Sequence, residues 1–103
     1  MTLHRLECAE PLKPGDIRPV QVQGRALVLV CGERGPALVD AICPHAGARL
    51  AEGEVVGHRL RCPGHRFVFD LDTGDCARGR REGWGPLKVY PLQNVDGQLF
   101  VEL

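Results

Sequence analysis

Two short segments, each with one cysteine and one histidine, constrain this 103-residue chain more than any other feature. The first reads Cys-Pro-His at 43–45 and the second Cys-Pro-Gly-His at 62–65. Thiolate sulfur and imidazole nitrogen are both good metal ligands, and two loops that each carry one of them can close on a single metal site. The predicted ligands are Cys43, His45, Cys62 and His65. The rest of the chain is then a scaffold that holds the two loops opposite each other.

Length and charge place limits on the class of protein. A chain of this length fits one domain, and we expect residues 1–103 to form a single unit around one core. Lys plus Arg and Asp plus Glu both number 13, so net charge does not indicate a nucleic-acid partner or an anionic membrane surface. The sequence has no apolar signal core and no run approaching the roughly 20 apolar residues of a membrane span. We expect a cytoplasmic protein that binds neither nucleic acid nor membrane.

Short β-prone segments separated by Gly and Pro predict an all-β fold of antiparallel sheets. Residues 25–31 are the most β-prone, because they are rich in Val and Leu. Asp96-Gly97 is a strong hairpin signal near the C-terminus. Helix content should be low, since no long segment keeps a helical apolar period without Gly or Pro inside it. The expected strands cover residues 3–8, 17–22, 25–31, 36–42, 60–62, 67–70, 87–92 and 98–103.

Two metals fit two thiolates and two imidazoles. Zinc accepts this set tetrahedrally, but zinc fingers usually pair Cys with Cys and His with His, whereas each loop here mixes the two. A 2Fe-2S cluster whose irons are ligated differently, one by both thiolates and the other by both imidazoles, is the alternative. The mixed order favours the iron–sulfur cluster.

The two loops resemble the C-x-H and C-x-x-H ligand motifs of the Rieske family. The resemblance continues in Leu50 and Gly53, in the Phe-Asp and Thr-Gly pairs at 69–70 and 73–74, and in the last hairpin at 89–101. It implies the Rieske fold, an antiparallel β-sandwich with a small cluster-binding subdomain at roughly 43–70, and one 2Fe-2S cluster per chain.

The resemblance also assigns the ligands, with Cys43 and Cys62 on the inner iron and His45 and His65 on the outer one. With two thiolates and two neutral imidazoles the oxidised cluster carries no net charge, whereas four thiolates would leave it negative. An electron is therefore easier to add than in a plant-type ferredoxin.

Four positions depart from the Rieske proteins of respiratory and photosynthetic complexes. Those proteins form a disulfide between their loops, where this chain has Ala48 and Gly64. They also hydrogen-bond the cluster sulfur through a Ser and a Tyr, where this chain has Phe67 and Phe69. Fewer donors predict a potential at the low end of the Rieske range, on the order of −150 mV.

The resemblance implies an electron carrier and not an enzyme. Its partners would be a ferredoxin reductase and a terminal oxygenase that hydroxylates aromatic rings, both bound transiently by a monomer. The alternative is a fixed electron-relay subunit of a larger oxidoreductase, similar to the small subunit of assimilatory nitrite reductase.

Other residues of chemical interest have structural interpretations. Cys8, Cys31 and Cys76 lack a neighbouring ligand and are read as small core residues. His4 and His58 are read as structural or solvated. Four arginines near the loops could dock an acidic partner or form a solvated face with Glu52 and Glu54; they are Arg49, Arg59, Arg61 and Arg66. The role of Trp84 stays open.

Overall fold

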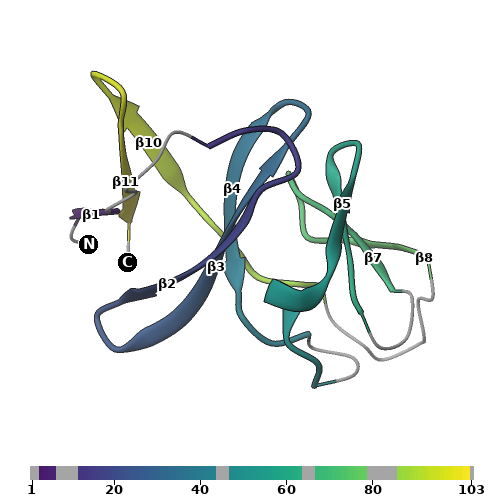
Figure 1. Ribbon diagram of the computed structural model, residues 1–103. Coiled ribbons are helices and arrows are strands. Elements are labelled where there is room, and N and C mark those ends of the chain that lie inside the picture. The colour runs from purple at the N-terminus through teal and green to yellow at the C-terminus, as the bar shows by residue number, and fades with distance from the viewer. Residues whose placement is uncertain (1–2, 7–11, 44–46, 64–66, 79–85, 103) are drawn as a thin grey trace.

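The computed structural model describes residues 3–6, 12–43, 47–63, 67–78 and 86–102 (Figure 1). Almost all its elements are strands, which confirms the all-β prediction. In chain order they are β1 (Leu3–Arg5), β2 (Ile17–Val22), β3 (Arg25–Gly32), β4 (Gly35–Asp40), the 3₁₀ turn η1 (Leu50–Glu52), β5 (Glu54–Val56), β6 (Arg59–Arg61), β7 (Val68–Asp70), β8 (Cys76–Arg78), β9 (Val89–Tyr90), β10 (Leu92–Val95) and β11 (Gln98–Glu102).

The strands form three antiparallel sheets. The central sheet has the order β2-β3-β4-β9, a second has β5-β6-β7-β8, and a third has β1-β11-β10. In Figure 1 the second and third sheets lie on opposite sides of the central one. The part of the chain that the structure describes contains no helix long and apolar enough to cross a membrane.

Strand β3 is buried on both faces, which explains its unbroken apolar run. Val28 and Val30 belong to a first core cluster, which lies between the central sheet and the β5–β8 sheet. Leu27 and Leu29 point the other way, into a second cluster with Leu38 and other residues next to the β10–β11 hairpin. Because successive side chains of a strand alternate between faces, one continuous apolar strand serves both cores.

Several strand limits differ from the sequence-based expectation. The segment expected as one strand at 87–92 is divided at Pro91 into β9 and β10. β9 pairs with β4 in the central sheet, whereas β10 pairs with β11 in the third sheet. β5 and β8 were not expected, because β5 lies in a Gly-rich segment and β8 directly precedes an Arg- and Gly-rich one, and both segments were interpreted as loops. β4 ends at Asp40, and Ile42 beyond it forms an isolated bridge with Arg49.

The other expected strands are confirmed with small shifts. The first is confirmed only over β1, since residues 7–11, which include Cys8, lie outside the described residues. Cys31 is buried and Cys76 is half-buried against the first core, as predicted for small core residues.

Gly74 connects the second sheet to the segment before β9. Its N–H donates to the Asp70 carbonyl at 2.7 Å, and its own carbonyl accepts from the Leu87 N–H at 2.9 Å. It has a φ of +80°, and a Cβ at this position would collide with the Leu87 carbonyl oxygen. Gly24 has nearly the same φ, +78°, with open space around it.

We expect Gly74→Ala to destabilise the protein much more than Gly24→Ala. Both substitutions place an alanine in the left-handed backbone region, which costs roughly 1–2 kcal/mol. Only Gly74→Ala must also displace the Leu87 carbonyl, which adds about 1–3 kcal/mol. Urea unfolding of the two variants measures the difference, and equal loss of stability would contradict the close approach of these two segments.

Candidate metal centre

The first ligand loop begins directly after the central sheet. Ile42 and Arg49 pair across its base. Inside this pair, the Cys43 N–H donates to the Ala48 carbonyl at 2.9 Å, and the Gly47 N–H donates to the Cys43 carbonyl at 2.9 Å. Gly47 has a φ of +68°, which a glycine adopts without strain. The loop is therefore held closed by its own backbone.

The second ligand loop is built in the same way. Arg61 and Val68 are the last paired residues of the β6–β7 hairpin on this side. Inside them, the Cys62 N–H donates to the Phe67 carbonyl at 2.7 Å. In both loops the cysteine N–H thus bonds to the carbonyl five residues later, so the two cysteines occupy equivalent places at the start of equivalent loops.

Both cysteines lie in the first core. Cys43 and Cys62 are each 1% exposed, and they share this cluster with Leu50, Leu60, Phe67, Phe69 and Leu87. Two thiols in one apolar core suit a shared metal group, because bound metal cations compensate the negative charge of the thiolates, which would otherwise make their burial costly.

The predicted histidine ligands fall outside this description. His45 and His65 lie in segments 44–46 and 64–66, which are outside the described residues, as is Gly64. Trp84, whose role the sequence leaves open, is also outside them. Two of the positions that differ from the respiratory and photosynthetic proteins are described in detail. Ala48 is half-buried and packs against the first core, and Phe69 is fully buried within it.

The segment between the loops is fixed by close packing. The Leu50 N–H donates to the Ala41 carbonyl at 2.9 Å, which ties η1 to the end of the central sheet. Gly53 follows η1, and a Cβ there would collide with the Arg61 carbonyl oxygen. The small residue lets η1 approach the strand that delivers Cys62.

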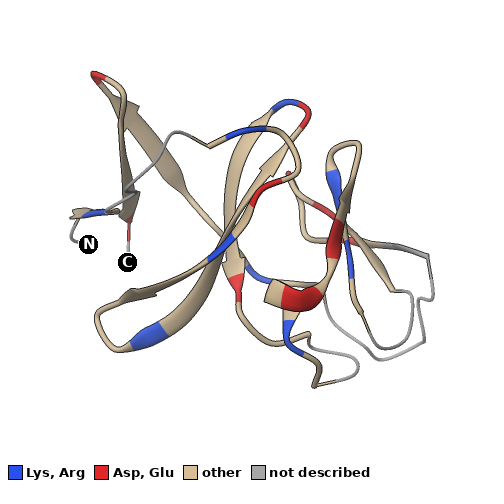
Figure 2. Cartoon of the chain, viewed as in Figure 1, with Lys and Arg blue, Asp and Glu red and all other residues tan. Residues whose placement is uncertain are grey.

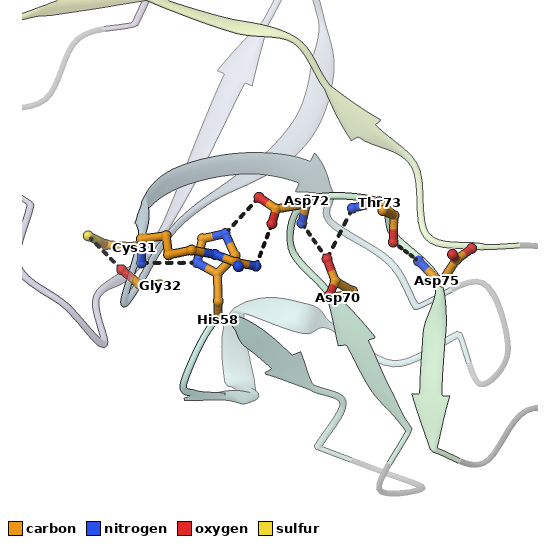
Figure 3. Close-up of polar contacts among 8 residues, drawn as sticks. Cys31, Gly32, His58, Asp70, Asp72, Thr73 and Asp75 are labelled. Carbon is orange, nitrogen blue, oxygen red and sulfur yellow. Dashed lines mark hydrogen bonds and ion pairs between the residues drawn. The ribbon is translucent and has the colours of Figure 1, made fainter.

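The ends of the strands opposite the loops are joined by a polar network around His58 (Figure 3). His58 is buried on the β5–β6 turn, and its Nδ1 accepts the Arg34 backbone N–H at 3.2 Å. A backbone N–H can only donate, so the proton of the neutral ring is on Nε2, which donates to Asp72 Oδ1 at 3.0 Å. Asp72 also pairs with the Arg34 guanidinium.

The network connects turns of two sheets. It joins the β3–β4 turn to the β5–β6 and β7–β8 turns, and the Glu33 N–H adds a bond to the Gly57 carbonyl at 3.0 Å. A Cβ at Gly32 would overlap the His58 ring. His58 is thus structural, as predicted, while half-buried His4 contacts Gln23 at 3.2 Å. The network itself was not predicted, since its partners are far apart in sequence.

Asp70 sits beside this network in the β7–β8 turn. Its Oδ1 accepts the N–H groups of Asp72 at 2.8 Å and Thr73 at 3.2 Å, as Figure 3 shows. The Asp72 N–H, together with that of Thr73 and the nearby positive charge of Arg34, lowers the pKa of Asp70 against the opposing effect of burial.

Comparisons with known proteins give a consistent result. A family model described as "Rieske [2Fe-2S] domain" matches residues 4–91. The ferredoxin component of the naphthalene 1,2-dioxygenase system of Pseudomonas putida is 31% identical over 91 residues, covering 86% of this chain and 84% of the relative.

A longer relative is the probable 3-ketosteroid-9-alpha-monooxygenase oxygenase component of Rhodococcus rhodochrous, 34% identical over 103 residues. The match covers 95% of this chain but 26% of that protein, and two cholesterol 7-desaturases are matched over 16% and 21% of their length. The chain therefore spans about a quarter or less of these three relatives.

Solved structures share the fold. A chain in a complex of reduced oxygenase and oxidised ferredoxin of carbazole 1,9a-dioxygenase has a TM-score of 0.81 and 27% identity, covering 96% of this chain and 100% of the other. A putative NADH-dependent nitrite reductase small subunit from Mycobacterium tuberculosis has a TM-score of 0.80 over 97% and 93% of the two chains. At 23% identity, the similarity to the nitrite reductase small subunit shows a shared fold alone.

Replacing the two non-ligand histidines should separate structural from ligand roles. His58→Ala leaves the Arg34 N–H and Asp72 without their buried partner, which should cost roughly 1–3 kcal/mol of stability. His4→Ala removes an exposed contact and should change stability by less than about 0.5 kcal/mol. Both variants should keep the visible spectrum of the metal centre. Loss of that spectrum in soluble, folded His58→Ala protein would contradict the ligand set.

Asp70→Asn should reduce stability at neutral pH, because a charged acceptor of two N–H groups is replaced by a neutral one. The pKa of Asp70 is lower in the folded chain, so its contribution is present above its ordinary pKa and is lost as pH falls through the lowered one. The difference in unfolding free energy between the wild type and Asp70→Asn should therefore shrink as the pH falls below the ordinary pKa of an aspartate. A difference that stays constant with pH would overturn this assignment.

Proposed function

Because this chain belongs to the Rieske [2Fe-2S] family, we propose that it is a one-electron carrier whose cluster is held by Cys43, His45, Cys62 and His65. The observation that carries the ligand set is the equivalence of the two loops. Each begins with a cysteine that is 1% exposed and closed by the same backbone hydrogen bond, and a histidine follows each cysteine in sequence.

When bound, the cluster accepts and releases one electron. Cys43 and Cys62 supply the negative charge of the ligand set from inside an apolar core. His45 and His65, as neutral ligands, add none. Burial of the thiolates in an apolar core favours the oxidised state, which has no net charge, over the reduced state, which is negatively charged. Phe67 and Phe69 exclude water from the same core.

We further propose that residues 1–103 form one Rieske domain, with the cluster-binding subdomain at roughly 43–70, and that it moves electrons from a reductase to a terminal oxygenase. The dioxygenase ferredoxin components support this role, because this chain matches most of their length. Aromatic rings are the proposed substrates of the oxygenase. The carrier itself catalyses no reaction, and as a monomer it can meet donor and acceptor in turn.

A second candidate is a fixed electron-relay subunit of a larger oxidoreductase. The fold likeness to a nitrite reductase small subunit is the observation that favours it. Such a subunit would co-purify with a large partner in stoichiometric amounts, whereas a diffusing carrier would be isolated alone and would still turn over with a separate reductase and oxygenase.

His45→Ala and His65→Ala should each abolish the native cluster, because removal of an imidazole leaves the outer iron with one protein ligand. Visible absorption, iron and sulfide content and the spin-resonance signal of the reduced protein measure the loss. The matched controls are His4→Ala and His58→Ala, which should retain all three. A colourless wild type that contains zinc would overturn the cluster assignment.

A further inference from the structure

The turn between β10 and β11 combines a reactive dipeptide with an uncommon backbone conformation. Asp96 is followed by Gly97, and no other aspartate of the chain precedes a glycine. The φ angles are +52° at Asp96 and +84° at Gly97, so both central residues of this two-residue hairpin loop are in the left-handed region. Asp96 is exposed, and nothing lies within 4 Å of the place that a Cβ on Gly97 would take. The main-chain nitrogen after Asp96 is therefore open to close approach.

The surroundings of the Asp96 carboxylate do not hold it in place. Within the described part of the chain, no backbone N–H binds this carboxylate and no ion pair involves it. The hairpin at 92–102 contains no Lys or Arg in its sequence. Figure 2 shows the same arrangement, with an acidic tip on a hairpin that carries no basic residue. The carboxyl group is thus free to rotate toward its own backbone.

The Gly97 nitrogen, by contrast, is held by a side chain. Its N–H donates to Asn94 Oδ1 at 3.0 Å, across the turn. This hydrogen bond keeps the N–H directed at Asn94 and must break before the nitrogen can bond to the Asp96 side chain. Asn94 therefore restrains the atom with which the Asp96 carboxyl group would react.

A second turn of the chain has the same backbone without the reactive residue. Gln23 and Gly24 join β2 to β3 with φ angles of +52° and +78°. A glutamine side chain is one methylene longer than that of an aspartate, so its attack by the next nitrogen must close a six-membered ring, which is much slower than closing a five-membered one. This type of turn therefore accepts glutamine, and Asp96→Gln is a matched unreactive replacement.

We propose that Asp96 is a modification site, at which the chain converts spontaneously to isoaspartate. The Gly97 nitrogen attacks the side-chain carboxyl carbon of Asp96 and forms a C–N bond, while the nitrogen's proton and a carboxyl oxygen leave as water. The product is a five-membered succinimide. Water then adds to the former main-chain carbonyl of Asp96 and breaks its bond to the Gly97 nitrogen, so the chain now runs through the Asp96 side chain. The water lost in the first step is regained in the second, and no other reactant is needed.

The product does not fit this turn. Isoaspartate adds one carbon to the backbone of a loop whose two residues match the twist of the flanking strands. The pair of Val95 with Gln98 adjoins this loop and should lose its register first. Val101 of β11 is fully buried in the second core, whereas Cys43 and Cys62 lie in the first. In Figure 1 the β10–β11 hairpin and the β5–β8 sheet are on opposite sides of the central sheet. The modification should weaken the second core and leave the metal centre intact.

The test follows isoaspartate in the cluster-containing wild type, in Asn94→Ala and in Asp96→Gln. Each protein is stored at neutral pH well below its unfolding temperature, with a parallel sample unfolded in urea. Transfer of a labelled methyl group by an isoaspartate-specific carboxyl methyltransferase measures the amount, and peptide mapping locates the residue. Neither measurement depends on the cluster, so this proposal and the proposed function stand or fall separately.

In the folded wild type, Asp96 should be modified before any other aspartate. Folded Asn94→Ala should form isoaspartate about two- to tenfold faster, the range that corresponds to the net contribution of one hydrogen bond. In urea the two proteins should react at equal rates, because the restraint exists only in the folded turn. No isoaspartate at Asp96, or earlier modification of another aspartate, would exclude the site. Equal rates of the two folded proteins would exclude the restraint by Asn94.

Stability and spectrum test the structural consequence. The stored wild type should unfold at a lower urea concentration than the fresh protein and should keep its visible spectrum. Asp96→Gln, stored in the same way, should keep both its unfolding midpoint and its spectrum. An equal loss of stability in Asp96→Gln would place the ageing elsewhere in the chain. Loss of the spectrum in step with isoaspartate would contradict the independence of the first core from this turn.

Discussion

The backbone hydrogen bond that closes each ligand loop is the interaction on which the rest of the structure depends. It fixes where each cysteine stands relative to the end of its sheet. A slip of one residue in β6–β7 would move Cys62 from the core face to the solvent face, because strand side chains alternate. The register of Arg61 with Val68 therefore decides whether the two thiols can share one buried site.

This register is fixed from the far end as well as from the loops. The His58 network binds the β3–β4 turn to the second sheet at the ends of the strands opposite the cysteines. The Leu71 N–H donates to the His58 carbonyl at 3.1 Å, and this hydrogen bond ties the β7–β8 turn to the same network. Between these two fixed ends, strands of three to six residues keep Cys43 and Cys62 in the same core.

Local signals in the sequence were sufficient for much of the fold. The apolar run of β3 and the Asp96-Gly97 turn are features of neighbouring residues, and both were interpreted correctly from the sequence, whereas the ligand set stays a prediction. The family and its cluster were identified from the resemblance of the two loops to Rieske ligand motifs, and the match to the family model confirms them.

Features made by residues distant in sequence could not be predicted. β5 and β8 lie in or beside segments whose glycines indicate loops, and they form strands because a neighbouring strand pairs with them. The contact of His58 with Asp72 and Arg34 depends on three turns that meet only in the folded chain. The arginines near the loops looked alike in sequence, and only the pairing of Arg61 with Glu54 distinguishes it from Arg49.

That distinction connects the buried centre to the surface. The thiolates need an apolar core that water does not enter, so the cysteines are placed at the inner side of the loops. An electron carrier must also be reached by another protein, which requires a surface next to the same loops. The pair at the base of the first loop meets both needs, since its backbone closes the loop over Cys43 and its side chains face outward. One cross-strand pair therefore closes the loop beside the buried Cys43 and leaves its own side chains on the surface.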